Sequence, residues 1–186
     1  MGLRRGFDGR GQTIGLELAG GAEAAGGQAW AALRDGRALQ IAADEPGLAV
    51  ALACGAALRA WGPKAEPARL HILTPAAGEA RRLWALAEPG IIGNRFARDL
   101  VVAPANRLTP RDFVGRLRAL SGHVLKVGVR GRKRLPRDGF GALCAVGRAA
   151  ASGPVLVTLR WPGAGRPGAL VGKGVCLVAR GTRLNG

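Results

Sequence analysis

Apolar and polar positions in the first part of the chain alternate between a period of two and a period near 3.6. Residues 13–18 and 37–42 alternate as short strands do, and residues 69–73 form a third strand-like run ended by Thr-Pro. Residues 47–61 are apolar on nearly every side and stop at Gly-Pro, which predicts a helix buried against a sheet. His71 is expected at a half-exposed strand position rather than as a metal ligand.

Two helices are predicted between residues 76 and 102, separated by Pro89 and Gly90. The first covers residues 76–87 and has a charged outer face. In the second, which begins near residue 91, apolar residues recur at helical spacing and charged residues are expected to face away from them. The apolar set is Ile92, Phe96 and Leu100, and the charged set is Arg95, Arg98 and Asp99.

A further helix is predicted to begin after Thr109, with Thr109 as N-cap, Pro110 at the first helical position and Asp112 in the first turn. Its expected buried face consists of Phe113, Leu117 and Leu120. Beyond it the period returns to two, which predicts strands near residues 124–130, 155–161 and 169–177. Because helices and strands alternate, a mixed or mostly parallel sheet is expected.

The last predicted strand carries an unusual polar position. Within the apolar run 170–175, Lys173 stands between two glycines, which let a ligand or another backbone approach it closely. An ammonium group next to a core strand costs free energy unless it is paired, or deprotonated and used as a ligand. Local sequence alone favours the alternative, an exposed Lys at a strand end.

The excess of basic over acidic residues has two possible explanations. The chain has 28 basic and 12 acidic residues, a net charge of +16. This charge attracts nucleic acid or anionic surfaces, but a composition biased towards Arg, Ala and Gly by a GC-rich genome explains it equally well. The basic run 130–137 is expected to be a solvated loop rather than a specific nucleic-acid contact, because no aromatic residue is interleaved for stacking.

The remaining composition predicts a soluble cytoplasmic protein. The three cysteines, Cys54, Cys144 and Cys176, are far apart and are expected to be thiols of a reducing compartment. No signal-peptide pattern and no membrane-spanning run is present, so no membrane partner is expected. A P-loop is excluded because Gly174 follows Lys173 where Ser or Thr is required.

Four segments, in order, resemble signatures of the leucyl aminopeptidase (cytosol aminopeptidase) family. Residues 97–110 are similar to the end of the helix that links the family's two domains, and residues 139–148 are similar to its G-M-G-A segment. The strand at 155–160 and the G-K-G segment at 170–175 follow in the family's order.

The resemblance implies an α/β fold class in three parts. These are a shortened N-terminal sheet-and-helix domain, a linker helix, and the first strands and helices of a mixed α/β zinc-peptidase-like catalytic domain. The expected boundaries are residues 1–88, 89–102 and 103–186.

The family's chemistry is metal-dependent removal of N-terminal residues from peptides by a homohexamer. Two divalent ions, zinc or manganese, share a bridging water and polarise the scissile carbonyl. The resemblance implies that Lys173 is a metal ligand through a neutral amine. Beyond the G-K-G segment the similarity to the family ends. Val178 stands where the family has a metal-ligating Asp, and Asn185 stands where the family has a second Lys.

The chain also ends before the family's N-T-D-A-E-G-R segment, which carries further carboxylate ligands. We therefore expect a truncated, inactive member that binds no metal and has no catalytic residue of its own, so its status as an enzyme stays open. A change of reading frame after Gly174 is one explanation for the abrupt departure. A basic nucleic-acid-binding protein and a non-catalytic partner in hexamer assembly are the alternatives.

Overall fold

A computed structural model describes most of the chain, as two compact units that comprise residues 1–99 and residues 100–186. The expected boundaries at residues 88 and 102 stay predictions, whereas the α/β class is confirmed. The described residues are 4–8, 13–16, 20–33, 38–62, 69–104, 106–121, 125–149, 151–163 and 165–176.

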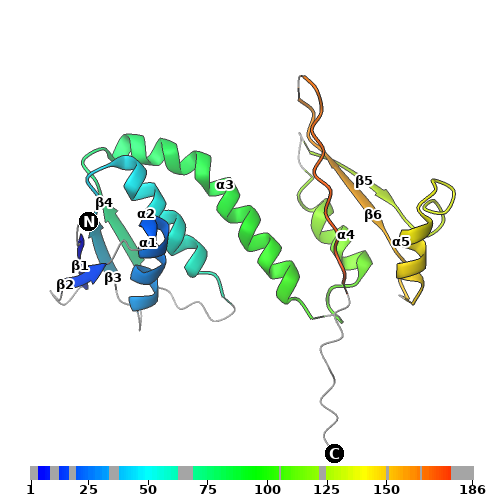
Figure 1. The fold of residues 1–186 in the computed structure, drawn as a ribbon, viewed down its shortest axis with the longest axis horizontal. Helices are drawn as coiled ribbons and strands as arrows, with labels where there is room; N and C mark the ends of the chain where they lie inside the picture. The colour runs from blue at the N-terminus through cyan, green and yellow to red at the C-terminus, as the bar shows by residue number, and fades with distance from the viewer. Residues whose placement is uncertain are drawn as a thin grey trace, which may run out of the picture. The chain divides into compact units, whose positions relative to one another are not determined.

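The first unit contains a four-stranded mixed sheet with the order β2-β1-β3-β4 (Figure 1). Its strands are β1 (Arg4–Asp8), β2 (Thr13–Leu16), β3 (Ala38–Ala42) and β4 (Arg69–Leu73). Strand β1 pairs antiparallel with both β2 and β3, and β3 pairs parallel with β4. The three strands predicted in this unit are therefore confirmed, and β1 is a fourth strand that the sequence pattern does not predict.

Two helices pack together against this sheet: α1 (Gly21–Ala32) and α2 (Pro46–Arg59). Helix α2 is the predicted apolar helix, and it connects the parallel strands β3 and β4, which need such a crossover. The core combines small helix residues with larger strand residues. It consists of Ala25, Ala29, Leu39, Ile41, Ala43, Ala49 and Leu52.

Helices α1 and α2 approach each other closely at two glycines. A Cβ atom added to Gly26 would overlap the backbone carbonyl of Leu52, and one added to Gly55 would overlap the backbone carbonyl of Glu23. A glycine of each helix therefore lies directly against the backbone of the other helix. No side chain larger than a hydrogen atom fits at either position without separating them.

Helix α3 (Ala77–Val102) is one continuous element with Pro89 inside it, so the predicted break at Pro89 and Gly90 is wrong. A proline removes one helical hydrogen bond and disfavours the turn before it. Contacts beyond it stabilise the following turns: Ile91 is buried, and two arginines bond to α2. The predicted apolar face is also wrong in part, because Ile92 is 59% exposed.

The arginines expected to face away from the protein instead bind the C-terminal end of α2. Arg95 donates from Nη2 and Nε to the carbonyl oxygen of Ala57, at 2.5 and 3.2 Å, and Arg98 Nη1 donates to that of Leu58 at 2.7 Å. The last carbonyls of a helix lack helical partners and carry partial negative charge, so guanidinium groups suit them. Asp99 adds a third contact, accepting from Trp61 Nε1 at 2.7 Å.

The second unit contains α4 (Pro110–Arg118), β5 (Lys126–Arg130), α5 (Gly141–Val146), a 3-10 turn at Gly147–Ala149 and β6 (Leu156–Arg160). Strands β5 and β6 correspond to the strands predicted near residues 124–130 and 155–161, and they pair antiparallel. The predicted strand at 169–177 is wrong as far as it is described, because residues 169–176 form no strand. Among the described residues, no third strand of this unit offers that segment a ladder of hydrogen bonds.

Helix α4 begins as predicted, with a reciprocal capping box. The Asp112 carboxylate accepts hydrogen bonds from Thr109 Oγ1 at 2.6 Å and from Thr109 N at 3.0 Å, while Asp112 N donates to Thr109 Oγ1 at 3.3 Å. Leu117 is buried as expected, together with Val114, and Phe113 is half-buried. Leu120 is 44% exposed, because the helix ends at Arg118 and leaves it beyond the last turn.

The capping box predicts a pH-dependent contribution to stability. Hydrogen bonds from the Thr109 hydroxyl and then from the Thr109 backbone N–H lower the pKa of the Asp112 carboxyl in the folded state. The carboxylate therefore stabilises the fold above the ordinary Asp pKa of about 3.9, and this contribution is lost as pH falls through the lower folded-state value.

We expect Asp112→Asn to destabilise the chain at neutral pH, with the difference from the parent chain shrinking below about pH 4. Urea unfolding of both proteins between neutral pH and about pH 2 measures this difference. Glu88→Gln, which changes an exposed carboxyl group on α3 that has no role in this cap, is the control. A difference that stays constant over the whole range would contradict a role for the ionised carboxylate.

Candidate metal site

Lys173 lies on an extended, exposed segment of the second unit. The segment from residue 169 to residue 175 is exposed, with Val171 97% and Val175 53% exposed. The prediction of a buried strand around Lys173 is therefore wrong, and the side chain lies in solvent. Its assignment as a metal ligand stays a prediction. Val178 and Asn185, where the match to the family fails, lie outside the described residues.

One carboxylate acts on this segment electrostatically. Burial raises the pKa of the Cys176 thiol, and the negative charge of Asp112 raises it further. The Asp112 carboxylate is itself engaged by Thr109 in the capping box. Among the described residues, no group of three or more His, Cys, Asp or Glu side chains could hold a metal ion.

The donor set of the described residues does not fit a dinuclear metal centre. Such a centre needs several carboxylates to neutralise and position two divalent ions. The described part of this segment offers one exposed lysine and, nearby, one carboxylate engaged in a helix cap. No catalytic step is therefore assigned to a metal held by these residues.

Other candidate groups are remote from such chemistry. Cys54 is buried in α2, where burial and then the charge of Glu23 raise the pKa of its thiol. His71 is exposed on β4 rather than half-exposed. Within the described part of the chain, no helix is both long and apolar enough to span a membrane.

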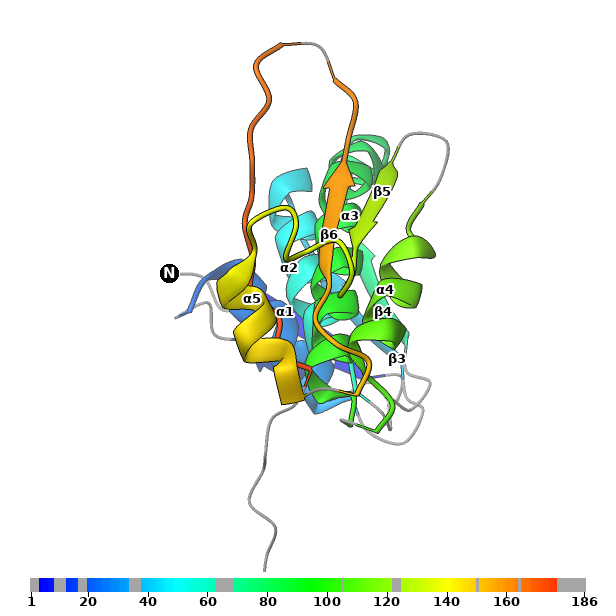
Figure 2. The same cartoon turned by 90° about the vertical axis from the view of Figure 1, so that its right-hand side faces the viewer.

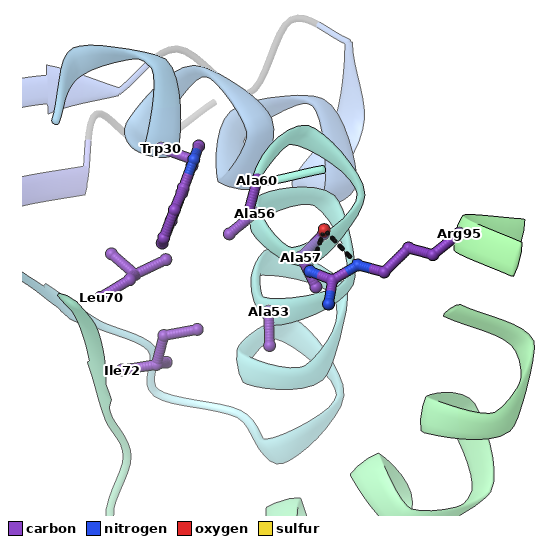
Figure 3. A pocket seen from close by; sticks show the side chains of 8 residues that line it. All are labelled: Trp30, Ala53, Ala56, Ala57, Ala60, Leu70, Ile72 and Arg95. Atoms are coloured by element: carbon purple, nitrogen blue, oxygen red, sulfur yellow. Dashed lines mark hydrogen bonds between the residues drawn. The ribbon is translucent and has the colours of Figure 1, made fainter. Parts of the chain in front are cut away.

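A cavity of about 240 Å³ in the first unit has no counterpart in the sequence pattern (Figure 3). The lining side chains are apolar apart from the indole N–H of Trp30 and the guanidinium of Arg95, which is bound to the Ala57 carbonyl. The cavity therefore contains no acid, base or metal-ligand pair for hydrolysis. The lining residues are Trp30, Ala53, Ala56, Ala57, Ala60, Leu70, Ile72 and Arg95.

Comparison with known proteins extends the family resemblance over most of the chain. Residues 95–185 match the catalytic domain of the Cytosol aminopeptidase family. A probable cytosol aminopeptidase of Rhizobium meliloti is 32% identical over 174 residues, covering 81% of this chain and 35% of the relative. Another, from Dinoroseobacter shibae, is 37% identical over 133 residues, covering 67% of this chain and 27% of the relative.

A solved structure agrees with these matches in fold. The bottromycin maturation enzyme BotP in complex with Mn has a TM-score of 0.63 and 31% identity to this chain, covering 74% of it and 32% of the BotP chain. Fold and sequence thus agree on an α/β protein related to these chains. The chain belongs to the cytosol aminopeptidase family, and it spans about a third of the length of the relatives that it matches.

Proposed function

We propose that this chain is the N-terminal domain and the opening part of the catalytic domain of a metal-dependent leucyl aminopeptidase. The complete enzyme is a hydrolase that removes N-terminal residues from peptides at a dinuclear site. The chain by itself is a truncated, inactive member. The observation that carries this proposal is the match of residues 95–185 to the family's catalytic domain.

Cofactor and assembly follow from the same family membership. Zinc or manganese is the metal of the complete enzyme, and the presence of Mn in the related BotP structure supports manganese. When bound, such ions supply an activated water and polarise the substrate carbonyl. The complete protein is cytoplasmic, in keeping with the names of its relatives as cytosol aminopeptidases. That it is a homohexamer is what the resemblance to the family implies.

Within this proposal, Lys173 is the one metal ligand that the chain contributes. The glycines on either side leave its surroundings open, since a Cβ at Gly172 or Gly174 would meet nothing within 4 Å. The exposed apolar residues around it, Leu170 and Val171, are those that the remaining catalytic sheet covers in the complete enzyme. Lys173 then becomes a ligand only when carboxylates from outside this chain hold the ions.

A chimera tests the proposal. Residues 1–175 of this chain are joined to the part of the Rhizobium meliloti relative that follows the corresponding G-K-G segment. We expect the purified chimera to hydrolyse leucine p-nitroanilide when manganese is added. Lys173→Ala in the chimera should lower kcat/KM by more than the roughly 10- to 100-fold typical when a residue that only supports a metal ligand is removed.

Lys126→Ala in the same chimera is the matched control, because Lys126 is also an exposed lysine of the second unit. Its activity should equal that of the parent chimera. A folded chimera with no manganese-dependent hydrolysis would contradict the assignment of this chain to the enzyme. Equal loss of activity in both lysine variants would contradict the role given to Lys173.

A further inference from the structure

The positive charge of the chain is concentrated in its second unit. Residues 1–99 contain 12 basic and 10 acidic side chains, whereas residues 100–186 contain 16 basic and 2 acidic ones. The basic residues are thus spread along the chain, but the acidic residues are not. A genomic bias towards arginine explains the first fact and leaves the second unexplained. The net charges of the two parts are +2 and +14.

One face of the β5–β6 pair is basic. The register places Lys126 opposite Arg160, Gly128 opposite Thr158 and Arg130 opposite Leu156. Opposite residues of an antiparallel pair lie on the same face, so Lys126, Arg130 and Arg160 share one face. Lys126 and Arg160 are both exposed. Two like charges directly opposite each other destabilise a sheet unless an anion lies between them.

The loop that follows β5 consists of hydrogen-bonded turns around a buried side chain. Backbone N–H groups of Arg134 and Leu135 both donate to the Gly131 carbonyl, at 2.9 and 3.0 Å, and Asp138 N donates to Arg134 O at 3.0 Å. The side chain of Leu135 is fully buried. The loop therefore has a defined shape, and it holds four exposed basic residues around its buried leucine: Arg132, Lys133, Arg134 and Arg137.

A shared carboxylate joins this loop to the basic strand face. Asp138 Oδ2 lies 2.9 Å from Arg130 Nε on β5 and 3.2 Å from Arg134 Nε in the loop. Asp112, the other carboxylate of residues 100–186, is engaged in the cap of α4. The loop and the strands thus form one basic surface, defined by Lys126, Arg130, Arg132, Lys133, Arg134, Arg137 and Arg160, with a single carboxylate inside it.

Aromatic residues adjoin both ends of this basic surface. Trp161 directly follows Arg160 and is 71% exposed, and Phe140 directly follows the loop and is 37% exposed. The sequence alone predicts a merely solvated loop, because no aromatic residue interrupts the basic run. Strand β6 lies beside β5 (Figure 2), and its register puts Arg160, the residue before Trp161, opposite Lys126. An exposed aromatic ring therefore adjoins the cations of the two strands, although none interrupts the basic run of the loop.

We propose that the basic surface binds single-stranded nucleic acid. Cations spread over two strands and a loop suit a chain of phosphates, whereas a single phosphate or nucleotide needs an enclosed site. Exposed aromatic rings beside the cations suit unpaired bases, which stack on them whatever their sequence. This binding is independent of the peptidase chemistry proposed above and uses none of the residues around the G-K-G segment.

The test measures fluorescence anisotropy of a labelled single-stranded oligonucleotide titrated with the full chain at several salt concentrations. We expect the affinity to fall linearly with salt on logarithmic axes. Replacing Lys126 and Arg160 together by serine should reduce the magnitude of that slope by about 1.4, roughly 0.7 for each single-strand phosphate that the protein no longer neutralises. Trp161→Ala should weaken binding of the single strand more than binding of a duplex, and Trp161→Phe should restore it.

The matched control replaces Arg81 and Arg82, two exposed arginines on α3 in the first unit, by serine. It removes the same charge and should leave the slope unchanged. Equal effects of the two double variants, or equally tight binding of polyglutamate, would overturn the proposal. Asp138→Asn gives an independent check: it removes the carboxylate inside the surface and should tighten binding, whereas unchanged or weaker binding would count against it.

Discussion

Replacing Gly26 by alanine should lower the free energy of unfolding by about 1 to 3 kcal/mol, although alanine is the better helix former. The new methyl group would overlap the carbonyl of Leu52, which belongs to the backbone of α2 and cannot rotate away as a side chain does. The two helices would have to separate. Separation opens gaps around Ala25, Ala29 and Leu52, which are all buried in the core of the first unit.

Gly27→Ala is the matched control, one residue further along the same helix. A Cβ at Gly27 would lie 3.6 Å from the Gly55 carbonyl oxygen, which is ordinary van der Waals contact. The helical preference of alanine should therefore dominate, with a gain of about 0.5 to 1 kcal/mol. Urea unfolding of the full chain, followed by far-UV circular dichroism, compares the two. Equal shifts of both variants in the same direction would show that the helix contact is not as close as described.

The same contact explains why α1 is not predicted from the sequence. Sequence patterns detect helices by large apolar residues at helical spacing, and residues 21–32 contain mainly glycine and alanine. Their burial comes from close approach of two backbones rather than from large side chains. Helix α2 is predictable because its leucines and terminal Gly-Pro are ordinary helix signals.

Capping chemistry is predictable, whereas contacts with distant helices are not. Thr109 and Asp112 lie three residues apart, so their capping box can be derived from local sequence alone. Arg95 and Arg98 bind carbonyls of α2 that are 38 and 40 residues away in the sequence. A charged residue on a helix is ordinarily expected in solvent, and local sequence carries no sign of this partner.

At the candidate metal site, local sequence predicts a buried strand that the structure does not contain. The segment 170–175 has the apolar composition of a buried strand, yet its residues are exposed and unpaired as a strand. A buried strand requires neighbours on both edges or faces, and composition alone does not supply them. The family's order of segments is therefore enough to single out Lys173, while its surroundings could not be derived from the sequence.

The purified chain should show no metal-dependent hydrolysis of leucine amides and no stoichiometric binding of zinc or manganese at Lys173. A lysine amine keeps its proton at neutral pH, and a metal displaces that proton only where other ligands already hold the ion. The carboxylate that acts on this segment, Asp112, is bound in a helix cap. Val178, which the resemblance aligns with a metal-ligating Asp of the family, has no side-chain oxygen to offer.

Val178→Asp should therefore fail to restore activity, because one added carboxylate does not assemble a site for two ions. Assays supplemented with manganese or zinc, on the chain, on Val178→Asp and on Lys173→Ala, should give the same background rate for all three. Calorimetric titration with each metal should likewise give indistinguishable curves for the chain and the Lys173→Ala variant. Leucine-amide turnover that requires metal and disappears with Lys173→Ala would show that the chain assembles a working centre by itself, and would overturn the proposal that it is inactive.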